Sequence, residues 1–221
     1  MTESIAATTE LRPIAEGAVL AALAVELSAA PRVALDAEGD GFYRYRARLC
    51  TLQLASGARV AVIDTLAIDD LSCIATMLGP SGPRKVVHDA AFDARMLAKR
   101  GCVLGNVFDT AIAARFLGES ATGLSSLLSR YLGIELTKEQ QQADWGRRPI
   151  EREALAYLVA DVEHLLPLAE LLEARLRERD LVEEVEEESR YALARALDPE
   201  PERPPWTRIK GARDLDEGGL A

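Results

Sequence analysis

The stretch VALDAEGDGFYRYRARLCTLQL, residues 33–54, starts with the branched and apolar residues of a buried strand and then presents two carboxylates. Residues i and i+2 of a strand point to the same face, so Asp36 and Glu38 are predicted to project together. Two like charges at that spacing repel each other unless they face water or hold a cation between them. The other acidic residues decide between a solvated strand end and a cation site.

Composition limits the class of protein. The chain has 221 residues, 48% of them hydrophobic, which is enough for one sizeable core. Its formal net charge of −10 argues against a general nucleic-acid coat or a binder of anionic membranes, but leaves a locally basic groove open. The three cysteines are odd in number and form no CxxC, which is typical of reduced core thiols in a cytoplasmic protein without a zinc site.

The apolar run at 18–30 is interpreted as an amphipathic helix. Glu10 and Glu16 precede it where a signal peptide has basic residues, and Glu26 interrupts it. No stretch reaches the roughly 18 to 20 uncharged residues of a membrane span. We therefore expect no membrane association and a cytoplasmic location.

The order of apolar runs predicts an α/β fold. Three strand-like runs with short links suggest an antiparallel meander, after which helices and short strands alternate, and residues 110–197 read as helical with breaks near Gly118–Gly123, Gly133 and Pro149. A meander feeding a partly parallel, mixed sheet with helices on its faces fits a ribonuclease-H-like fold. The predicted strands are 32–39, 48–56, 59–65 and 85–89; the predicted helices among them are 68–78 and 90–101, and a short apolar piece follows at 102–109.

The sequence divides near residue 198. Residues 1–198 are predicted to form the main domain, and the acidic run 183–188 within it to be a solvated helix face. Residues 199–221 begin Pro-rich, as an extended linker does, and end in a short helical stub.

Two later stretches offer partners for the first carboxylate pair. VVHDAAFDARML, residues 86–97, contains Asp93 in a helix that follows a strand. YLVADVEHL, residues 157–165, contains Tyr157 and Asp161, which lie at i and i+4 and therefore share one helix face. A phenol is thus predicted to lie beside a carboxylate in the same cleft.

These residues, in this order, resemble the three exonuclease motifs of the DEDD superfamily in its tyrosine subgroup, and within it ribonuclease D. The segments FDTAIAARFLG (108–118), GLSSLLSRYLGIEL (123–136) and KEQQQADWGRRPIEREALAYLVADVEHLLPL (138–168) also resemble connecting segments of that family. The resemblance covers roughly residues 12 to 180. Ala37 is a departure, since the family more often has threonine there. PWTRIKGARDL (205–215) resembles the opening of the helical domain that follows the nuclease.

The predicted chemistry is two-metal hydrolysis. A phosphodiester is hydrolysed at neutral pH when two hard divalent cations provide the nucleophile and neutralise the leaving oxygen. We expect Asp36 to bridge both ions, Glu38 and Asp161 to complete the nucleophile side, Asp93 to hold the other ion, and Tyr157 to orient the attacking water. An all-oxygen ligand set favours Mg²⁺ or Mn²⁺.

Basic residues are weaker candidates for substrate contacts. Three arginines alternate after the acidic pair and would share one face if that stretch were extended; further cations flank the DWGRRP segment. The candidates are Arg44, Arg46, Arg48, Lys138, Arg147 and Arg148. Among the remaining polar residues, His88 is expected to be a hydrogen-bonded strand-end histidine, and Asp89 and Asp109 to be helix caps.

The sequence thus predicts a metal-dependent 3′-to-5′ exoribonuclease that releases nucleoside 5′-monophosphates; trimming of transfer-RNA precursors is implied by the resemblance alone. A DNA exonuclease of the same superfamily remains an alternative, because contacts to a 2′-hydroxyl are not visible in a sequence. A catalytically silent nucleic-acid-binding module is the third reading. The oligomeric state is left open.

Overall fold

The computed structural model describes residues 12–136 and 142–198. Five strands form one mixed sheet in the order β3-β2-β1-β4-β5, with the first three antiparallel and β4 and β5 parallel to β1. The predicted meander and the mixed sheet are confirmed. The strands are β1 (Arg32–Gly39), β2 (Leu49–Ser56), β3 (Arg59–Asp64), β4 (Arg84–Val87) and β5 (Val107–Asp109).

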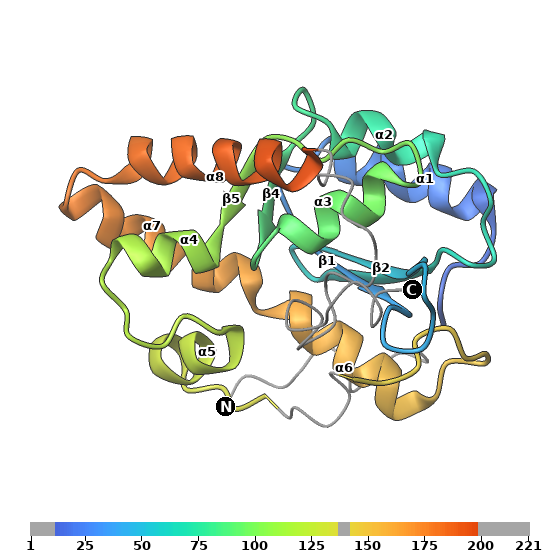
Figure 1. Ribbon diagram of the computed structural model, residues 1–221. Helices are drawn as coiled ribbons and strands as arrows, with labels where there is room; N and C mark the ends of the chain where they lie inside the picture. Colours follow the sequence, from blue (N-terminus) through green and yellow to red (C-terminus); the bar gives the residue numbers. More distant parts are fainter. Residues whose placement is uncertain (1–11, 137–141, 199–221) are drawn as a thin grey trace, which may run out of the picture.

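Helices cover both faces of this sheet (Figure 1). Helices α1, α2 and α3 pack on one face around a large apolar cluster, while α4, α5, α6 and α7 cover the other face with two further clusters. The helices are α1 (Gly17–Ser28), α2 (Ser72–Leu78), α3 (Ala91–Ala98), α4 (Thr110–Phe116), α5 (Leu124–Leu132), α6 (Arg152–Glu163), α7 (Leu165–Glu178) and α8 (Val182–Leu197).

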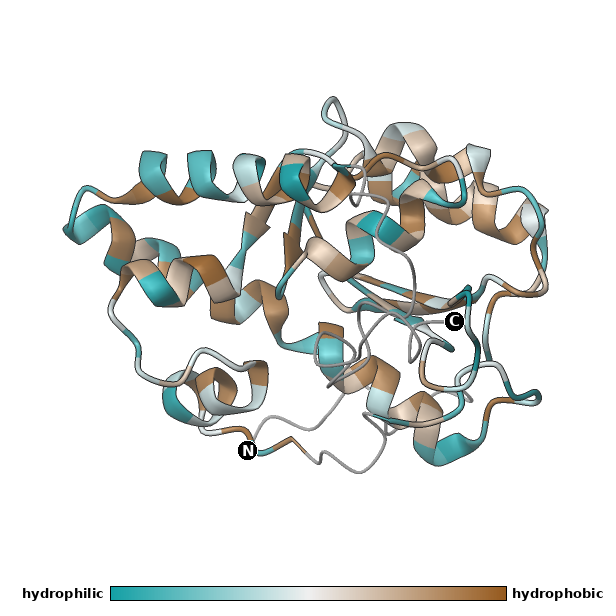
Figure 2. Ribbon diagram, in the orientation of Figure 1, coloured by the Kyte–Doolittle hydropathy of each residue, from teal (hydrophilic) through white to brown (hydrophobic). Residues whose placement is uncertain are grey.

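The outward side of α8 is hydrophilic and its inward side apolar (Figure 2). Glu183, Glu184 and Glu187 are exposed, whereas Val185 is buried. Glu186 forms an ion pair with Arg84 at 2.8 Å. The predicted solvated acidic face over 183–188 is therefore confirmed.

The pleat of β1 separates its apolar from its acidic residues. Val33, Leu35 and Ala37 join the cluster beneath α1, α2 and α3. Ala34 lies in the cluster on the opposite face, and Asp36 and Glu38 follow it at the two-residue spacing that keeps side chains on one face. Both carboxylates therefore point toward the α6 side of the sheet, as the sequence predicts.

The site forms where parallel β1 and β4 end at the same edge. The β1–β2 register shifts between Glu38 and Gly39, which ends the regular ladder there. A Cβ on Gly39 would lie 2.8 Å from the carbonyl oxygen of Arg48, so only glycine lets these two backbone segments approach this closely. Helix α3 begins at Ala91, shortly after β4, and brings its first turn to that edge.

Two local predictions are wrong. Residues 41–47 form turns closed by bonds from the amides of Tyr43 and Arg44 to the Asp40 carbonyl, so the arginines of this stretch do not share one extended face. Helix α2 begins at Ser72 and not near residue 68, because the Asp70 carboxylate accepts the Ser72 amide and hydroxyl in a turn.

Some predictions fall outside the described residues, namely those for Lys138 and residues 199–221. The division near residue 198 and the cytoplasmic location stay predictions. Within the described ranges, none of the helices has the length and apolar character needed to cross a membrane.

Candidate active site

A cavity of about 600 Å³ opens at the ends of β1 and β4. Its carboxylates and a phenol come from three elements that are far apart in the sequence: β1, the first turn of α3, and α6. We call it the carboxylate cavity; the residues that give it this name are Asp36, Glu38, Asp93, Tyr157 and Asp161. All five candidate catalytic residues of the sequence analysis therefore line one cavity.

Three of the carboxylates form a compact group, here called the acidic cluster. One oxygen from each of Asp36, Glu38 and Asp161 lies within 4.8 Å of the others. Asp93 is not part of that group, although it lines the same cavity and is only 3% exposed. Its charge interacts with that of Asp36. The acidic cluster thus gives one tight ligand set, with a fourth carboxylate beside it.

Burial and mutual repulsion disfavour the ionised forms of these groups. Burial and the neighbouring Asp161 raise the pKa of Asp36 to about 8, and burial with the charges of Asp36 and Asp161 raises the pKa of Glu38 to about 9. Burial also raises the pKa of Asp161, to about 6, against a lowering by the hydrogen bond from Tyr157. The pKa of Asp93 is raised well above its usual value, mainly by burial and by Asp36.

Tyr157 lies one helical turn before Asp161 and hydrogen-bonds to its carboxylate. Burial, with the negative charges of Asp161 and Glu38, raises the pKa of the phenol above its ordinary value. The hydroxyl therefore keeps its proton at neutral pH and acts as a hydrogen-bond donor. The predicted pairing of a phenol with a carboxylate is present.

Gln53 is a site residue to which the sequence analysis gave no role. It is fully buried and lies directly opposite Asp36 in the β1–β2 ladder. In the amide orientation that satisfies all partners, its nitrogen donates to Asp36 Oδ2 at 3.3 Å and to the Asp36 carbonyl at 2.7 Å, while its oxygen accepts from Thr51. The signal was available: polar Thr51 and Gln53 alternate along an otherwise apolar strand.

Asp109 fixes the turn that leads into α3. Its carboxylate accepts the amides of Ala111 and Ile112 as the N-cap of α4, and also those of Asp89 and Ala90 in the turn after β4. Asp89 has φ of +62°, a conformation that few residues other than glycine adopt. The N-cap prediction for Asp109 is confirmed; the one for Asp89 is wrong, because Ala90 occupies the N-cap of α3 and no side chain caps it.

His88 is hydrogen-bonded at the end of β4, as predicted. Its Nδ1 lies 2.9 Å from Thr110 Oγ1, whose own proton goes to the Val87 carbonyl. Nδ1 must therefore be the donor, which leaves Nε2 without a proton in the neutral ring. Burial lowers the pKa of His88, against a raising effect of Asp109 and Asp89.

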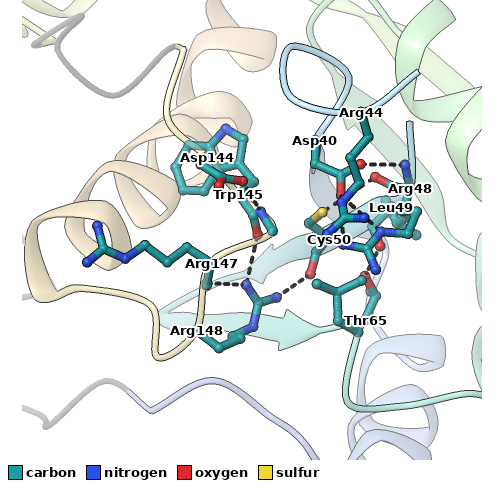
Figure 3. A network of polar contacts seen from close by, with 12 residues as sticks. Asp40, Arg44, Arg48, Leu49, Cys50, Thr65, Asp144, Trp145, Arg147 and Arg148 are labelled. Carbon is teal, nitrogen blue, oxygen red and sulfur yellow. Dashed lines mark hydrogen bonds and ion pairs between the residues drawn. The ribbon is translucent and has the colours of Figure 1, made fainter. Parts of the chain in front are cut away.

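Most of the candidate arginines are engaged by the protein itself (Figure 3). Arg44 and Arg48 form ion pairs with buried Asp40 at 3.0 and 2.8 Å. Arg148 grips Asp64 through two contacts of 2.6 and 2.7 Å and also donates to backbone carbonyls. These three guanidinium groups hold the turns around the site together, which is a structural role; their predicted substrate contacts stay predictions.

Arg46 and Arg147 are more accessible. Arg46 is exposed. The guanidinium of Arg147 is 74% exposed and lies 3.6 Å from Glu151 in a surface pair of little strength. The substrate contacts predicted for these two arginines also stay predictions.

The residues of the acidic cluster fit a hard divalent cation. All their donor atoms are carboxylate oxygens, the ligands that Mg²⁺ and Mn²⁺ prefer. No ion pair joins the cluster or Asp93 to a lysine or arginine of the described residues, so no basic side chain described there lowers their pKa values. A bound cation would remove the repulsion.

Comparison with known proteins gives consistent matches. Ribonuclease D of Zymomonas mobilis is 34% identical over 89% of this chain and 52% of its own length. The crystal structure of Escherichia coli RNase D, an exoribonuclease involved in structured RNA processing, superposes with a TM-score of 0.80 at 29% identity, over 94% of this chain and 56% of that one. Brucella melitensis NrnC with bound Mg²⁺ gives a TM-score of 0.70 at 25% identity, over 78% and 86% of the two chains.

The family assignment follows from a wider match. This chain spans about half the length of the curated ribonuclease D relatives it matches. A family model described as a 3′-5′ exonuclease matches residues 11–177, which include every residue of the carboxylate cavity named above. The chain therefore belongs to the 3′-5′ exonuclease family.

Proposed function

We propose that this protein is a metal-dependent 3′-to-5′ exoribonuclease that releases nucleoside 5′-monophosphates. The observation that supports it best is the convergence of three carboxylates from β1 and α6 within 4.8 Å, without a protein cation among the described residues to pair with them. Such an arrangement is costly unless it serves a ligand of opposite charge.

The carboxylates would hold two divalent cations, Mg²⁺ or Mn²⁺. Asp36, Glu38 and Asp161 would hold one cation, and Asp36 and Asp93 would hold the other. When bound, the cations supply a nucleophile at neutral pH and neutralise charge on the leaving oxygen. Gln53 keeps Asp36 oriented through the amide contacts described above.

Tyr157 would orient the attacking water. Its phenol is protonated at neutral pH and already hydrogen-bonded to Asp161, so it donates and does not act as a base. Its ring lies at the wall of the cavity, 5.9 Å from that of Trp145. The hydroxyl is therefore presented to the acidic cluster from a fixed direction.

RNA is the proposed polymer because the matched relatives include ribonuclease D from several bacteria and an exoribonuclease of known structure. Trimming of transfer-RNA precursors is a finer part of the proposal and rests on the same relationship. The cavity lies at a strand edge and is walled by α3, α5 and α6, which favours entry of a chain end over an internal bond.

The test is a digestion panel with RNA and DNA, single-stranded and hairpin, labelled at either end, with Mg²⁺ or Mn²⁺. We expect mononucleotides released from the 3′ end, a preference for RNA, and a block by a 3′-phosphate. Equal or faster digestion of DNA would overturn RNA as the proposed substrate. Cuts within a circular RNA would overturn the exonuclease proposal. No hydrolysis of any substrate would favour a silent binding module.

A further inference from the structure

Trp145 is the largest buried side chain that contacts the proposed catalytic tyrosine. It is 4% exposed, lines the carboxylate cavity, and places its ring centroid 5.9 Å from that of Tyr157 at an interplanar angle of 31°. This is the range in which aromatic pairs attract each other. Any shift of the indole would therefore be felt by the phenol ring.

The polar atom of the indole makes no contact that would fix the ring. Its Nε1 is buried and has no hydrogen-bond partner among the described residues. Trp145 also lines a second cavity of about 270 Å³, so it borders two cavities as well as the apolar cluster that contains Leu158 and Val159. A polar contact to its backbone adds to this packing in fixing its position.

Arg148 supplies that anchor (Figure 3). Its Nη1 donates to the Trp145 carbonyl at 2.8 Å, and its Nη2 donates to the Cys50 carbonyl in β2 at 2.9 Å. The same guanidinium makes the paired contacts to Asp64 at the end of β3. The backbone of Trp145 is thus attached to the central sheet through one side chain, since a bidentate guanidinium fixes orientation as well as distance.

We propose that Trp145, held by Arg148, is a positioning residue that fixes the ring of Tyr157 so that its hydroxyl reaches Asp161. The connected contacts run from β2 and β3 through Arg148 to Trp145, then to Tyr157 and the acidic cluster. Trp145 acts through Tyr157 and does not touch substrate. The inference rests on the proposed function, because its readout is hydrolysis.

The test is a double-mutant cycle between Trp145→Leu and Tyr157→Phe. Single-turnover hydrolysis of single-stranded RNA gives a rate constant at saturating enzyme and a half-saturation concentration. We expect Trp145→Leu to lower the rate constant by roughly 10- to 100-fold, the range of losses for a misplaced catalytic group, with little change in half-saturation. In the Tyr157→Phe background, Trp145→Leu should have no further effect, because the hydroxyl that it positions is already gone.

Two variants guard against general destabilisation. Trp145→Phe keeps an aromatic ring against Tyr157 but is smaller than the indole and lacks its N–H, so it should restore part of the rate. Phe108→Leu shortens another buried aromatic residue, which does not line the carboxylate cavity, and should leave the rate unchanged. If Trp145→Leu does not fold at the assay temperature, Arg148→Lys replaces it in the same cycle, since it loosens the anchor and keeps the indole.

The outcomes separate the inference from the function. An active wild type in which Trp145→Leu is equally harmful with and without the Tyr157 hydroxyl overturns the inference alone. A change confined to half-saturation also overturns it, because Trp145 would then contact substrate. A wild type inactive on every substrate defeats the proposed function and this inference together.

Discussion

Two pairs of carboxylates lie in strands β1 and β3 or directly after them, and they have opposite surroundings. Asp40 and Asp64 are 0% and 8% exposed, and each is gripped by arginine, Asp40 by Arg44 and Arg48 and Asp64 by Arg148. Burial alone would raise the pKa of both, but the arginine contacts lower it below its ordinary value. Asp36 and Glu38 have no such partner among the described residues, and their pKa is raised.

The difference shows how a fold marks a site. Where the carboxylate is structural, the fold places an arginine of the same chain in contact with it, as with Arg48 for Asp40. Where the carboxylate is proposed to be functional, the cation is left to come from solution. The pairs therefore predict opposite responses to mutation, pH and metal.

The largest expected effect is on catalysis. Asp161→Asn should lower hydrolysis roughly a thousandfold, because a metal ligand contributes about 4 kcal/mol to the transition state, while RNA binding changes little. Single-turnover rates and binding of labelled RNA measure the two effects. Asp69→Asn, on an exposed turn, is the matched control and should be neutral. Activity of Asp161→Asn within tenfold of wild type would contradict the assignment of a metal ligand.

The second prediction compares the thermal stability of two variants, each of which lacks the charge of one carboxylate from one pair. Asp64→Asn should lower the free energy of unfolding by about 2 kcal/mol with or without metal, because it removes the charged partner of Arg148. Asp36→Asn should be more stable than wild type in EDTA at pH 9, since one repelling charge is gone. It should also gain little from Mg²⁺, which raises the melting temperature of wild type by binding the folded state.

An equal response of wild type and Asp36→Asn to metal would mean that the carboxylates of β1 form a solvated strand end. A stable Asp64→Asn variant would mean that the Arg148 anchor is dispensable.

The third prediction concerns pH. In EDTA, the raised pKa values of about 8 for Asp36 and about 9 for Glu38 mean that the folded protein binds more protons than the unfolded chain from about pH 4 to pH 9. Stability should therefore fall as pH rises through that window, and Mg²⁺ should remove the fall. Asp40 and Asp64, with lowered pKa, lose their contribution instead as the solution becomes acidic. Denaturant titrations across pH measure both the alkaline and the acidic loss of stability. If Mg²⁺ does not change the alkaline loss, that loss does not come from the acidic cluster.

The smallest effect is expected at the exposed arginines. Arg46→Ala should weaken RNA binding a few-fold for every sequence and lower the salt dependence by about one counterion, since an exposed guanidinium meets phosphate and not base. Its stability should change by less than about 0.5 kcal/mol. Salt titrations of RNA binding test this. An unchanged salt slope would remove Arg46 from the substrate path.

The sequence correctly predicted the features that depend on the spacing of nearby residues. The two-residue spacing of Asp36 and Glu38 and the four-residue spacing of Tyr157 and Asp161 fixed their faces correctly, because strand and helix periods are local properties. The mixed sheet followed from the order of apolar runs. The resemblance then supplied the expectation that acidic residues from distant segments meet at one site.

What the sequence missed depends on contacts between distant residues. The sequence gives no sign that Arg148 is paired, because its partner Asp64 is distant in the chain and meets it only in the fold. Arg44 and Arg48 read as one face of a strand because nothing local shows that Asp40 will close a turn there. Gln53 acquires its role only from the β1–β2 register, which places it opposite Asp36.

One carboxylate, that of Asp109, has a further consequence. It accepts backbone amides from two segments, Asp89 and Ala90 before α3 and Ala111 and Ile112 at the start of α4. Amides that share one acceptor lose their protection together when that acceptor moves away. The two segments should therefore exchange their amide hydrogens with deuterium as a single cooperative unit, so that an opening at the start of α4 is at the same time an opening of the turn that leads to Asp93.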